Sequence, residues 1–290
     1  MKACDLCSCS SSSASSGFGD LSSSNFIGLR YIQQGYKSKD GIFENSPQSE
    51  ETFHTYQLWG RIPLSDKFYV SAIVPYQDLY RHFDDRVEHI NGLGDVNVMG
   101  WYQLSFYKKQ KNDSLVFATK ELSGHGLNFG LGMKLPTGEF EEQLTDRVNP
   151  GFQVGTGSWD VLATVLYSYK KKNLGVGASL AYYFKTENKN DYKFGNQLSG
   201  AANVFYSVSL KTIILKPFIG VSGDIYENIE QYSETLANTD GHMFNGSLGT
   251  EVSKEKFVLG VKYTLPIAQD LFEGNVNFQQ QYALYLNYSL

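Results

Sequence analysis

The sequence lacks any hydrophobic run that approaches the ~18 consecutive apolar residues of a transmembrane helix. A helical membrane protein is therefore excluded. Proline is also scarce, with 7 residues in 290, whereas glycine reaches 28 and the aromatic residues include 20 Tyr and 19 Phe. This composition is typical of many twisted strands, either in a transmembrane barrel with aromatic belts or in a soluble β-sandwich.

An excess of basic residues is missing too. The formal net charge is −5, and no basic patch interleaved with aromatic residues appears, so nucleic acid is not expected as a partner. The sequence contains no G-x-S-x-G, H-E-x-x-H or phosphate-binding loop, and its five histidines fall in predicted loops or at strand ends. We therefore do not expect an enzyme.

Cysteine is missing from all but the start of the chain. Cys4, Cys7 and Cys9 form a C-x-x-C-x-C cluster before a serine-rich stretch. We interpret residues 1–24 as a flexible Cys/Ser-rich segment that acts as a plug or as a metal-binding arm. Thiolates favour soft ions such as Cu(I) or Zn²⁺, while a Cys4–Cys7 disulfide and lipidation of Cys4 are two other interpretations. The residues before Cys4 are too few for a signal peptide, so we expect the chain to begin near a processed terminus.

From residue 25 onward, apolar and polar side chains alternate with a period of two. In 174–185 the even positions are Leu, Val, Ala, Leu, Tyr and Phe, opposite mostly small or polar residues. That period predicts a strand with one apolar face. About twelve such segments occur, each long enough to cross a bilayer obliquely. They span residues 25–36, 53–63, 67–79, 95–107, 126–137, 159–170, 173–185, 197–210, 213–227, 243–253, 256–266 and 277–290.

The expected connections alternate in length. Short turns at 65–66, 171–172, 211–212 and 254–255 follow every second strand, and long polar loops follow the others. This sorting is typical of an outer-membrane barrel with both termini in the periplasm. We therefore predict an all-β fold, an antiparallel transmembrane β-barrel of about twelve strands over residues 25–290, located in the bacterial outer membrane. The connection at 108–125 breaks the alternation and predicts a short extra element.

A lipid bilayer is then a partner of this chain. The long loops hold most of the acidic residues, including Glu50, Asp84 and Glu141. These loops are either ordinary solvated loops or contacts to lipopolysaccharide phosphates through bridging divalent cations.

Four short motifs resemble one protein family. They are IVPY at 73–76, GLGDV at 92–96, LPTG at 135–138 and GTGSWD at 155–160. In this order they resemble the outer-membrane transporters named for the meta-pathway of phenol degradation, which are distantly similar to fatty-acid-type channels. The C-x-x-C-x-C start with NFIGLRY at 25–31 resembles a Bacteroidetes branch of that family. The resemblance covers nearly the whole chain and implies a barrel that transports small solutes.

Charges of both signs occur on the predicted inner face. A charge on the lipid face costs about 2–4 kcal/mol at mid-depth, so we place these residues in the lumen. The predicted lumen lining is Arg30, Arg61, Asp95, Lys134, Asp160, Lys216, Asp224, Glu251 and Lys262. Two interpretations stay open, a structural ion-pair lattice that fills a narrow barrel and a selectivity lining. The near balance of signs disfavours strong selectivity for anions or cations.

Three prolines end strands on the long-loop side, namely Pro75, Pro136 and Pro266. Strand termination is one interpretation, since proline is permitted there. The other is a kink that opens a lateral exit through the barrel wall into lipid, as the resemblance to fatty-acid channels implies.

The sequence therefore predicts an outer-membrane channel for small, apolar solutes, with no open axial pore. Two alternative functions stay open. One is a metal-handling outer-membrane protein that binds copper through Cys4, Cys7 and Cys9. The other is a plugged barrel that serves as a structural or assembly partner of a periplasmic or outer-membrane protein.

Overall fold

The computed structural model describes residues 25–39, 48–108, 123–144 and 147–290. All regular secondary structure in these ranges is β. Among the residues described, none lies in a helix long and apolar enough to span a bilayer. The segment 1–24 with its three cysteines, and most of the connection at 108–125, lie outside the described residues.

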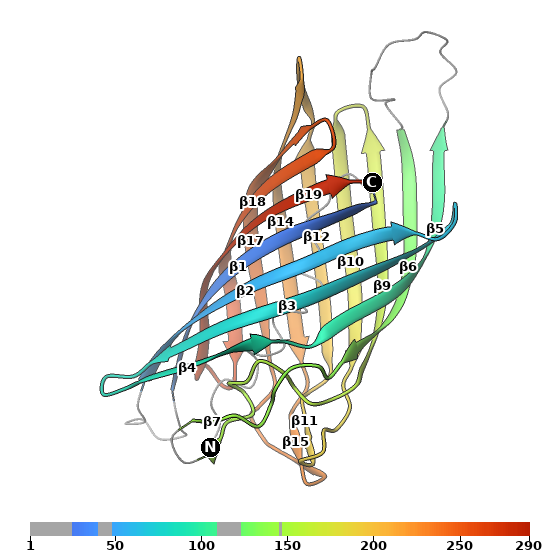
Figure 1. Ribbon diagram of the computed structural model, residues 1–290. Coiled ribbons are helices and arrows are strands. Elements are labelled where there is room, and N and C mark those ends of the chain that lie inside the picture. The colour runs from blue at the N-terminus through green and yellow to red at the C-terminus, as the bar shows by residue number, and fades with distance from the viewer. Residues whose placement is uncertain (1–24, 40–47, 109–122, 145–146) are drawn as a thin grey trace.

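Twelve long antiparallel strands close into one barrel (Figure 1). They are β1 Phe26–Lys39, β2 Gln48–Pro63, β3 Phe68–His82, β5 Val96–Lys108, β6 Ser123–Leu135, β9 Asp160–Lys171, β10 Leu174–Phe184, β12 Gln197–Tyr206, β14 Ile213–Tyr226, β17 Gly241–Lys254, β18 Phe257–Leu271 and β19 Val276–Ser289. The last strand pairs with the first, from Phe26 opposite Ser289 to Ser38 opposite Val276. Closure removes the strand edges, which a bilayer cannot satisfy. The predicted fold class is confirmed.

Turn geometry agrees with the predicted sorting of the connections. β9–β10 and β17–β18 are joined by two-residue turns, in which Lys172 and Glu255 have φ of 51° and 52°. Positive φ is the conformation that tight hairpins between twisted strands require. Phe26 and Ser289 pair at this same short-turn end, which is periplasmic in barrels of this type.

Seven shorter strands accompany the barrel. β4 (Val87–Leu93) pairs with the loop end of β3, and β13 (Val208–Leu210) continues β12 after Ser207 and pairs with β14. The others are β7 Gln143–Leu144, β8 Arg147–Val148, β11 Tyr192–Lys193, β15 Glu230–Gln231 and β16 Glu234–Thr235. The interval 80–94, between the segments predicted at 67–79 and 95–107, is one of the expected long polar loops, and β4 corrects that expectation. Its seven residues carry only a weak alternation of apolar and polar side chains.

The outer face of the barrel is apolar. The leucines that the alternation predicts to face lipid are strongly exposed: Leu180 at 55%, Leu248 at 59%, Leu259 at 46% and Leu286 at 46%. Exposed aromatic residues gather at the short-turn ends of the strands, among them Phe68, Phe106, Tyr206, Phe257 and Tyr288. An apolar outer belt with aromatic edges identifies the chain as a multi-pass barrel of the outer membrane.

Inside the barrel, aromatic rings lie against glycines of the neighbouring strand. Four such pairs face each other directly across the ladder: Trp101 and Gly130, Phe205 and Gly175, Phe218 and Gly249, Tyr285 and Gly260. A Cβ added at Gly130 would lie 2.6 Å from Trp101 Cζ3. The glycines therefore make room for the rings, and the rings occupy the cross-section of the lumen.

Gly130→Ala is expected to destabilise the barrel, because Trp101 has little freedom to move away. Its Nε1–H donates to Ser71 Oγ at 2.8 Å, and its ring stacks on Tyr69 with centroids 5.6 Å apart. Overpacking of this kind costs about 1–3 kcal/mol. The temperature at which the folded barrel loses its fast electrophoretic mobility measures the change.

Gly100→Ala on the adjacent strand is the matched control, since the nearest atom to an added Cβ there is 3.9 Å away. Its transition should stay close to that of the natural protein. If the two variants unfold at the same temperature, the packing of Trp101 on Gly130 does not limit stability.

Candidate functional site

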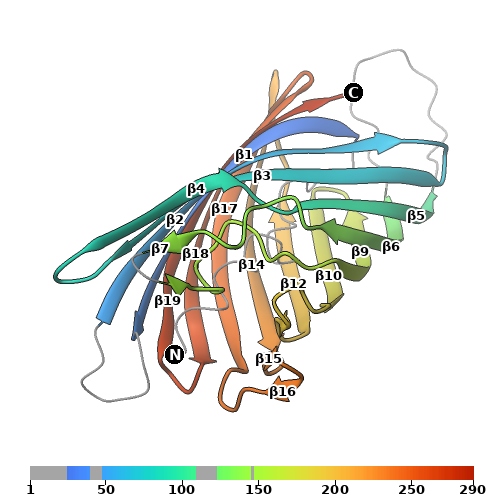
Figure 2. The same cartoon turned by 60° about the horizontal axis from the view of Figure 1, so that its bottom comes forward.

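The segment between β6 and β9 folds back into the mouth of the barrel at the long-loop end (Figure 2). Residues 151–156 are all buried although none belongs to a strand, and Phe152 is 0% exposed. Buried backbone groups outside a sheet need other partners. Gln77 Nε2 donates to the Val154 carbonyl at 3.0 Å, and the Gly155 N–H donates to the Glu139 carbonyl at 2.8 Å. We call the described residues 138–144 and 147–158 the inward loop.

The inward loop joins an apolar cluster that we call the mouth cluster. Its buried members are Tyr36, Phe53, Leu79, Ile90, Phe152, Val154, Tyr192, Phe194, Tyr226, Ile229, Met243, Leu271, Phe272, Val276 and Phe278. Phe152 is fully buried in it, with its ring 6.0 Å from that of Phe53 and 4.3 Å from the guanidinium carbon of Arg81. Arg81 also forms a fully buried ion pair with Glu51 at 2.8 Å. The long-loop end of the lumen is thus filled by apolar side chains packed around the buried Arg81–Glu51 pair.

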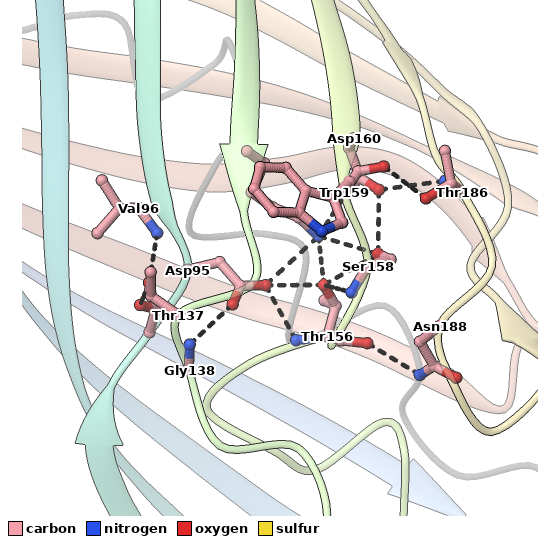
Figure 3. Close-up of polar contacts among 12 residues, drawn as sticks. Asp95, Val96, Thr137, Gly138, Thr156, Ser158, Trp159, Asp160, Thr186 and Asn188 are labelled. Carbon is pink, nitrogen blue, oxygen red and sulfur yellow. Dashed lines mark hydrogen bonds and ion pairs between the residues drawn. The ribbon is translucent and has the colours of Figure 1, made fainter.

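A buried ionic network ties the inward loop to the wall (Figure 3). Lys134 Nζ lies 2.6 Å from Asp160 Oδ2 and 3.4 Å from Asp95 Oδ2. Thr156 donates to Asp95 from its N–H at 2.9 Å and from its hydroxyl at 2.7 Å, and the Gly138 N–H donates to Asp95 at 3.0 Å. The Lys134 cation thus lies between the carboxylates of Asp95 and Asp160. Because Gly138 and Thr156 both donate to Asp95, this network fixes both ends of the inward loop.

The loop between β10 and β12 braces the inward loop from the other side. Asn188 Nδ2 donates to the Thr156 carbonyl at 2.9 Å. Lys189 Nζ lies 2.6 Å from Glu141 Oε2, and Asn190 Nδ2 donates to Glu141 Oε1 at 2.8 Å. These hydrogen bonds, first that of Lys189 and then that of Asn190, lower the pKa of the Glu141 carboxyl. The two long loops are therefore in contact at the mouth, through a buried bond at Asn188 and exposed contacts at Glu141.

The nine residues predicted to line the lumen are buried, except for Arg61, which is half-buried. They do not form a single site. Lys134, Asp95 and Asp160 form the network above. Lys216 lies 3.6 Å from Glu251, which also accepts from Tyr285.

The remaining predicted lumen residues have mostly neutral partners. Arg30 donates to Gln57 at 2.7 Å and Arg61 to Gln103 at 3.0 Å, and each guanidinium also stacks on an aromatic ring. Asp224 accepts from Ser199 and Gln197. Lys262 is buried and acts electrostatically on Asp224. Their role in selecting solutes stays a prediction.

The three predicted prolines lie in different settings. At Pro75, β3 changes partner, from β5 up to Ile73 to β4 from Tyr76 onward, and the Gly94 N–H donates to the Pro75 carbonyl at 2.9 Å. Pro136 follows the last residue of β6 and lies outside the ladder. Pro266 lies within β18, opposite Asn245 of β17.

The ladder between β18 and β19 is interrupted around Pro266. Its register pairs stop at Thr264 opposite Gln281 and resume only at Leu271 opposite Val276. The side chain of Gln269 bridges this interval, since its Nε2 donates to the Phe278 carbonyl at 3.0 Å and its Oε1 accepts from the Phe278 N–H at 2.8 Å. We call residues 265–270 the wall gap. The side-chain amide of Gln269 there replaces a hydrogen-bonding partner from the backbone. No pattern in the sequence indicated this replacement.

The hypothesis of a soft-metal site falls on Cys4, Cys7 and Cys9, which lie outside the described residues. Within the described ranges, no group of three or more His, Cys, Asp or Glu side chains could hold a metal ion.

Comparison with known proteins identifies relatives of this architecture. The sequence model of the family described as "Putative MetA-pathway of phenol degradation" matches residues 48–279. An outer membrane channel from Pseudomonas putida F1 superposes with a TM-score of 0.66 at 12% identity, covering 94% of this chain and 98% of that chain. The beta domain of the Bordetella autotransporter BrkA gives a TM-score of 0.52 at 10% identity, covering 92% and 100%. None of the curated proteins compared by sequence matches the chain. At these identities, the likeness to solved structures shows the fold.

Lys134→Met should strongly destabilise the closed mouth, because it leaves Asp95 and Asp160 buried without their cation. Removing one partner of a buried ion pair typically costs about 3–5 kcal/mol. Thermal unfolding followed by electrophoretic mobility, together with limited proteolysis of the inward loop, measures the effect. Adding Asp160→Asn should recover part of the loss, since it removes one uncompensated charge.

Lys189→Met is the matched control, because its N···O distance to Glu141 is also 2.6 Å but the pair is exposed to solvent. Exposed pairs contribute little, so no measurable change is expected. Equal effects of Lys134→Met and Lys189→Met would contradict a special role for the buried network.

Proposed function

Because this chain belongs to the family described as "Putative MetA-pathway of phenol degradation", we propose that it is an outer-membrane channel for small apolar solutes with a lateral exit. The observation that carries the proposal is the wall gap beside the apolar mouth cluster. A channel, rather than an enzyme, also agrees with the fold that this chain shares with an outer membrane channel from Pseudomonas putida F1.

The mouth cluster supports an apolar solute. Phe152 of the inward loop and its neighbours form a continuous apolar cluster at the long-loop end of the lumen. A polar solute would gain little there, because apolar and aromatic side chains offer few hydrogen-bonding groups. An apolar one would exchange contacts with those side chains at little cost. The mouth therefore favours apolar over ionic solutes.

The filled lumen toward the short-turn end supports a route other than an axial water-filled pore. Trp101, Phe205, Phe218 and Tyr285 are all buried on the inner face and lie against glycines. Lys216 and Glu251 fill further space with paired charges. An apolar solute gains nothing from water and must finally reach lipid, so a sideways path is the shorter one.

The wall gap supplies that path. β18 and β19 are not joined by backbone register pairs between Thr264 and Leu271. Within the same interval, β18 has a bulge at Ile267 in its ladder with β17, and β19 has a bulge at Gln279 in its ladder with β1. Bulges bend strands and end local pairing, and they are frequent at functional positions of barrels. Phe278, which Gln269 bonds, belongs to the mouth cluster. The gap therefore opens from the apolar part of the lumen.

Expression of the barrel in a Gram-negative host should speed uptake of N-phenyl-1-naphthylamine, an apolar probe that fluoresces on reaching lipid. The same protein in planar bilayers should pass little ionic current, because its inner side chains are packed. Large, steady single-channel currents without faster probe uptake would show a diffusion pore for hydrophilic solutes instead.

Two substitutions at the wall gap should change probe uptake in opposite directions. Pro266→Ala adds a backbone donor, and one extra hydrogen bond across the gap would slow uptake about fivefold. Gln269→Met removes both bonds to Phe278 at similar side-chain length and should raise uptake by up to about tenfold.

Pro217→Ala is the matched control, since Pro217 is exposed on β14 near the short-turn end and lies opposite Thr250. It should leave uptake unchanged. Equal uptake by all three variants would rule out the wall gap as the exit while leaving the channel itself in place.

A further inference from the structure

Three buried acceptor oxygens lie on the inner face of adjacent strands, close to the wall gap. They are Oε1 of Gln197 on β12, Oδ2 of Asp224 on β14 and Oδ1 of Asn245 on β17, and each accepts no hydrogen bond from any described residue. The three side chains are 0%, 0% and 3% exposed. Buried acceptors without a donor cost free energy, so a group of three indicates a place where a donor binds.

Hydrogen bonds fix the orientation of two of these oxygens. Gln197 Nε2 donates to Ser199 Oγ at 2.9 Å and to Asp224 Oδ1 at 3.1 Å, and the Ser199 hydroxyl donates to the same Asp224 oxygen at 2.5 Å. The nitrogen of Gln197 and one oxygen of Asp224 are thereby occupied. Gln197 Oε1 and Asp224 Oδ2 remain as acceptors, held in position by this network.

The third acceptor lies diagonally across the ladder. Asp224 pairs with Met243, and Asn245 is the next inner-face residue on β17. Diagonal neighbours of this kind lie about 7–8 Å apart, a span that one small group can fill with bonds to both sides. Asn245 in turn lies opposite Pro266, at the start of the wall gap.

Apolar side chains adjoin the acceptors on the mouth side. Tyr226 follows Asp224 on the same face of β14, Tyr183 pairs with Gln197, and Met243 pairs with Asp224. Tyr226 and Met243 both belong to the mouth cluster. Met243 is unbranched and can change rotamer, so it is the side chain that would move to admit a solute.

We propose that Gln197, Asp224 and Asn245 form a binding site for the hydroxyl group of an otherwise apolar solute. The hydroxyl donates to one of the free acceptors, and the apolar body replaces Met243 against the mouth cluster. The site rests on the proposed channel function and names its solute class as neutral alcohols and related hydroxyl compounds.

Nearby charges favour a neutral hydroxyl over an ammonium group. The positive charges of Lys185 and Lys262 both act on the Asp224 carboxylate. Lys185 Nζ also lies 5.9 Å from the ring centroid of Tyr226, beside Asp224. A further cation would be repelled by these two lysines, whereas a neutral donor would not. A hydrocarbon without a hydroxyl would leave the three acceptors unpaired and would bind less tightly.

The test uses the full chain refolded in detergent micelles with ¹³C-methyl methionine. Met243 is buried at the site, whereas Met133 is 44% exposed on the outer face and reports partitioning into the micelle. Benzyl alcohol should shift the Met243 resonance saturably, and benzyl methyl ether should need about five- to tenfold higher concentration. The preference for the alcohol should vanish in Asn245→Leu.

Asn203→Leu is the matched control, since Asn203 is another buried inner-face asparagine whose Oδ1 accepts from no described residue. It should retain the preference for benzyl alcohol, and both variants are first checked for folding by electrophoretic mobility. Equal shifts by alcohol and ether would overturn the hydroxyl site while leaving apolar uptake intact. A Met243 resonance that neither compound moves would overturn the site and count against apolar passage through this lumen.

Discussion

Backbone hydrogen bonding in a medium without water is the constraint on which this structure depends. Every N–H and C=O of a strand in the bilayer needs a partner from the protein, and a closed barrel provides one through its ladders. Pairing of Phe26 with Ser289 completes that closure. The interval between Thr264 and Leu271 departs from the rule, and there the side chain of Gln269 supplies an acceptor and a donor to the backbone of Phe278. The need to pair backbone groups thus explains both the closed barrel and the side-chain hydrogen bonds of Gln269 where the ladder is interrupted.

Closure also determines what the inner face must do. Strand alternation sends every second side chain into a narrow lumen, where polar groups must pair with one another. Lys134 forms ion pairs with Asp95 and Asp160. Tyr285 packs on Gly260 and donates a hydrogen bond to Glu251. At the mouth, the inward loop also supplies partners to a buried polar group, because the backbone N–H groups of Thr156 and Gly138 donate to Asp95. A lumen filled in this way supports the proposed route through the wall.

The strands could be predicted from the sequence because period-two alternation is a local signal. The segment predicted at 159–170 is β9, Asp160–Lys171, and Leu180 faces outward as its position requires. Two-residue strands such as β7 carry no period and could not be found. The inward loop was also missed, although its glycines hold a signal. A Cβ at Gly155 would lie 2.4 Å from the Gly138 carbonyl oxygen, so the motifs at 135–138 and 155–160 mark a close approach of two chain segments.

The surroundings of the prolines could not be predicted from the sequence. Pro75 and Pro266 both lie near the predicted ends of strands, but different parts of the structure pack against the two positions. Val154 of the inward loop backs the junction at Pro75: its carbonyl accepts from Gln77 and would lie 3.0 Å from a Cβ at Gly94. That junction is therefore sealed from the inside by a buried segment. The gap at Pro266 is bridged by the two hydrogen bonds of Gln269, and bonds of this kind contribute only about 0.5–1.5 kcal/mol each. Opening the wall at Pro75 would require the inward loop to leave the mouth cluster, whereas opening it at Pro266 requires a change of one side chain. On these energies the exit that we propose is placed between β18 and β19.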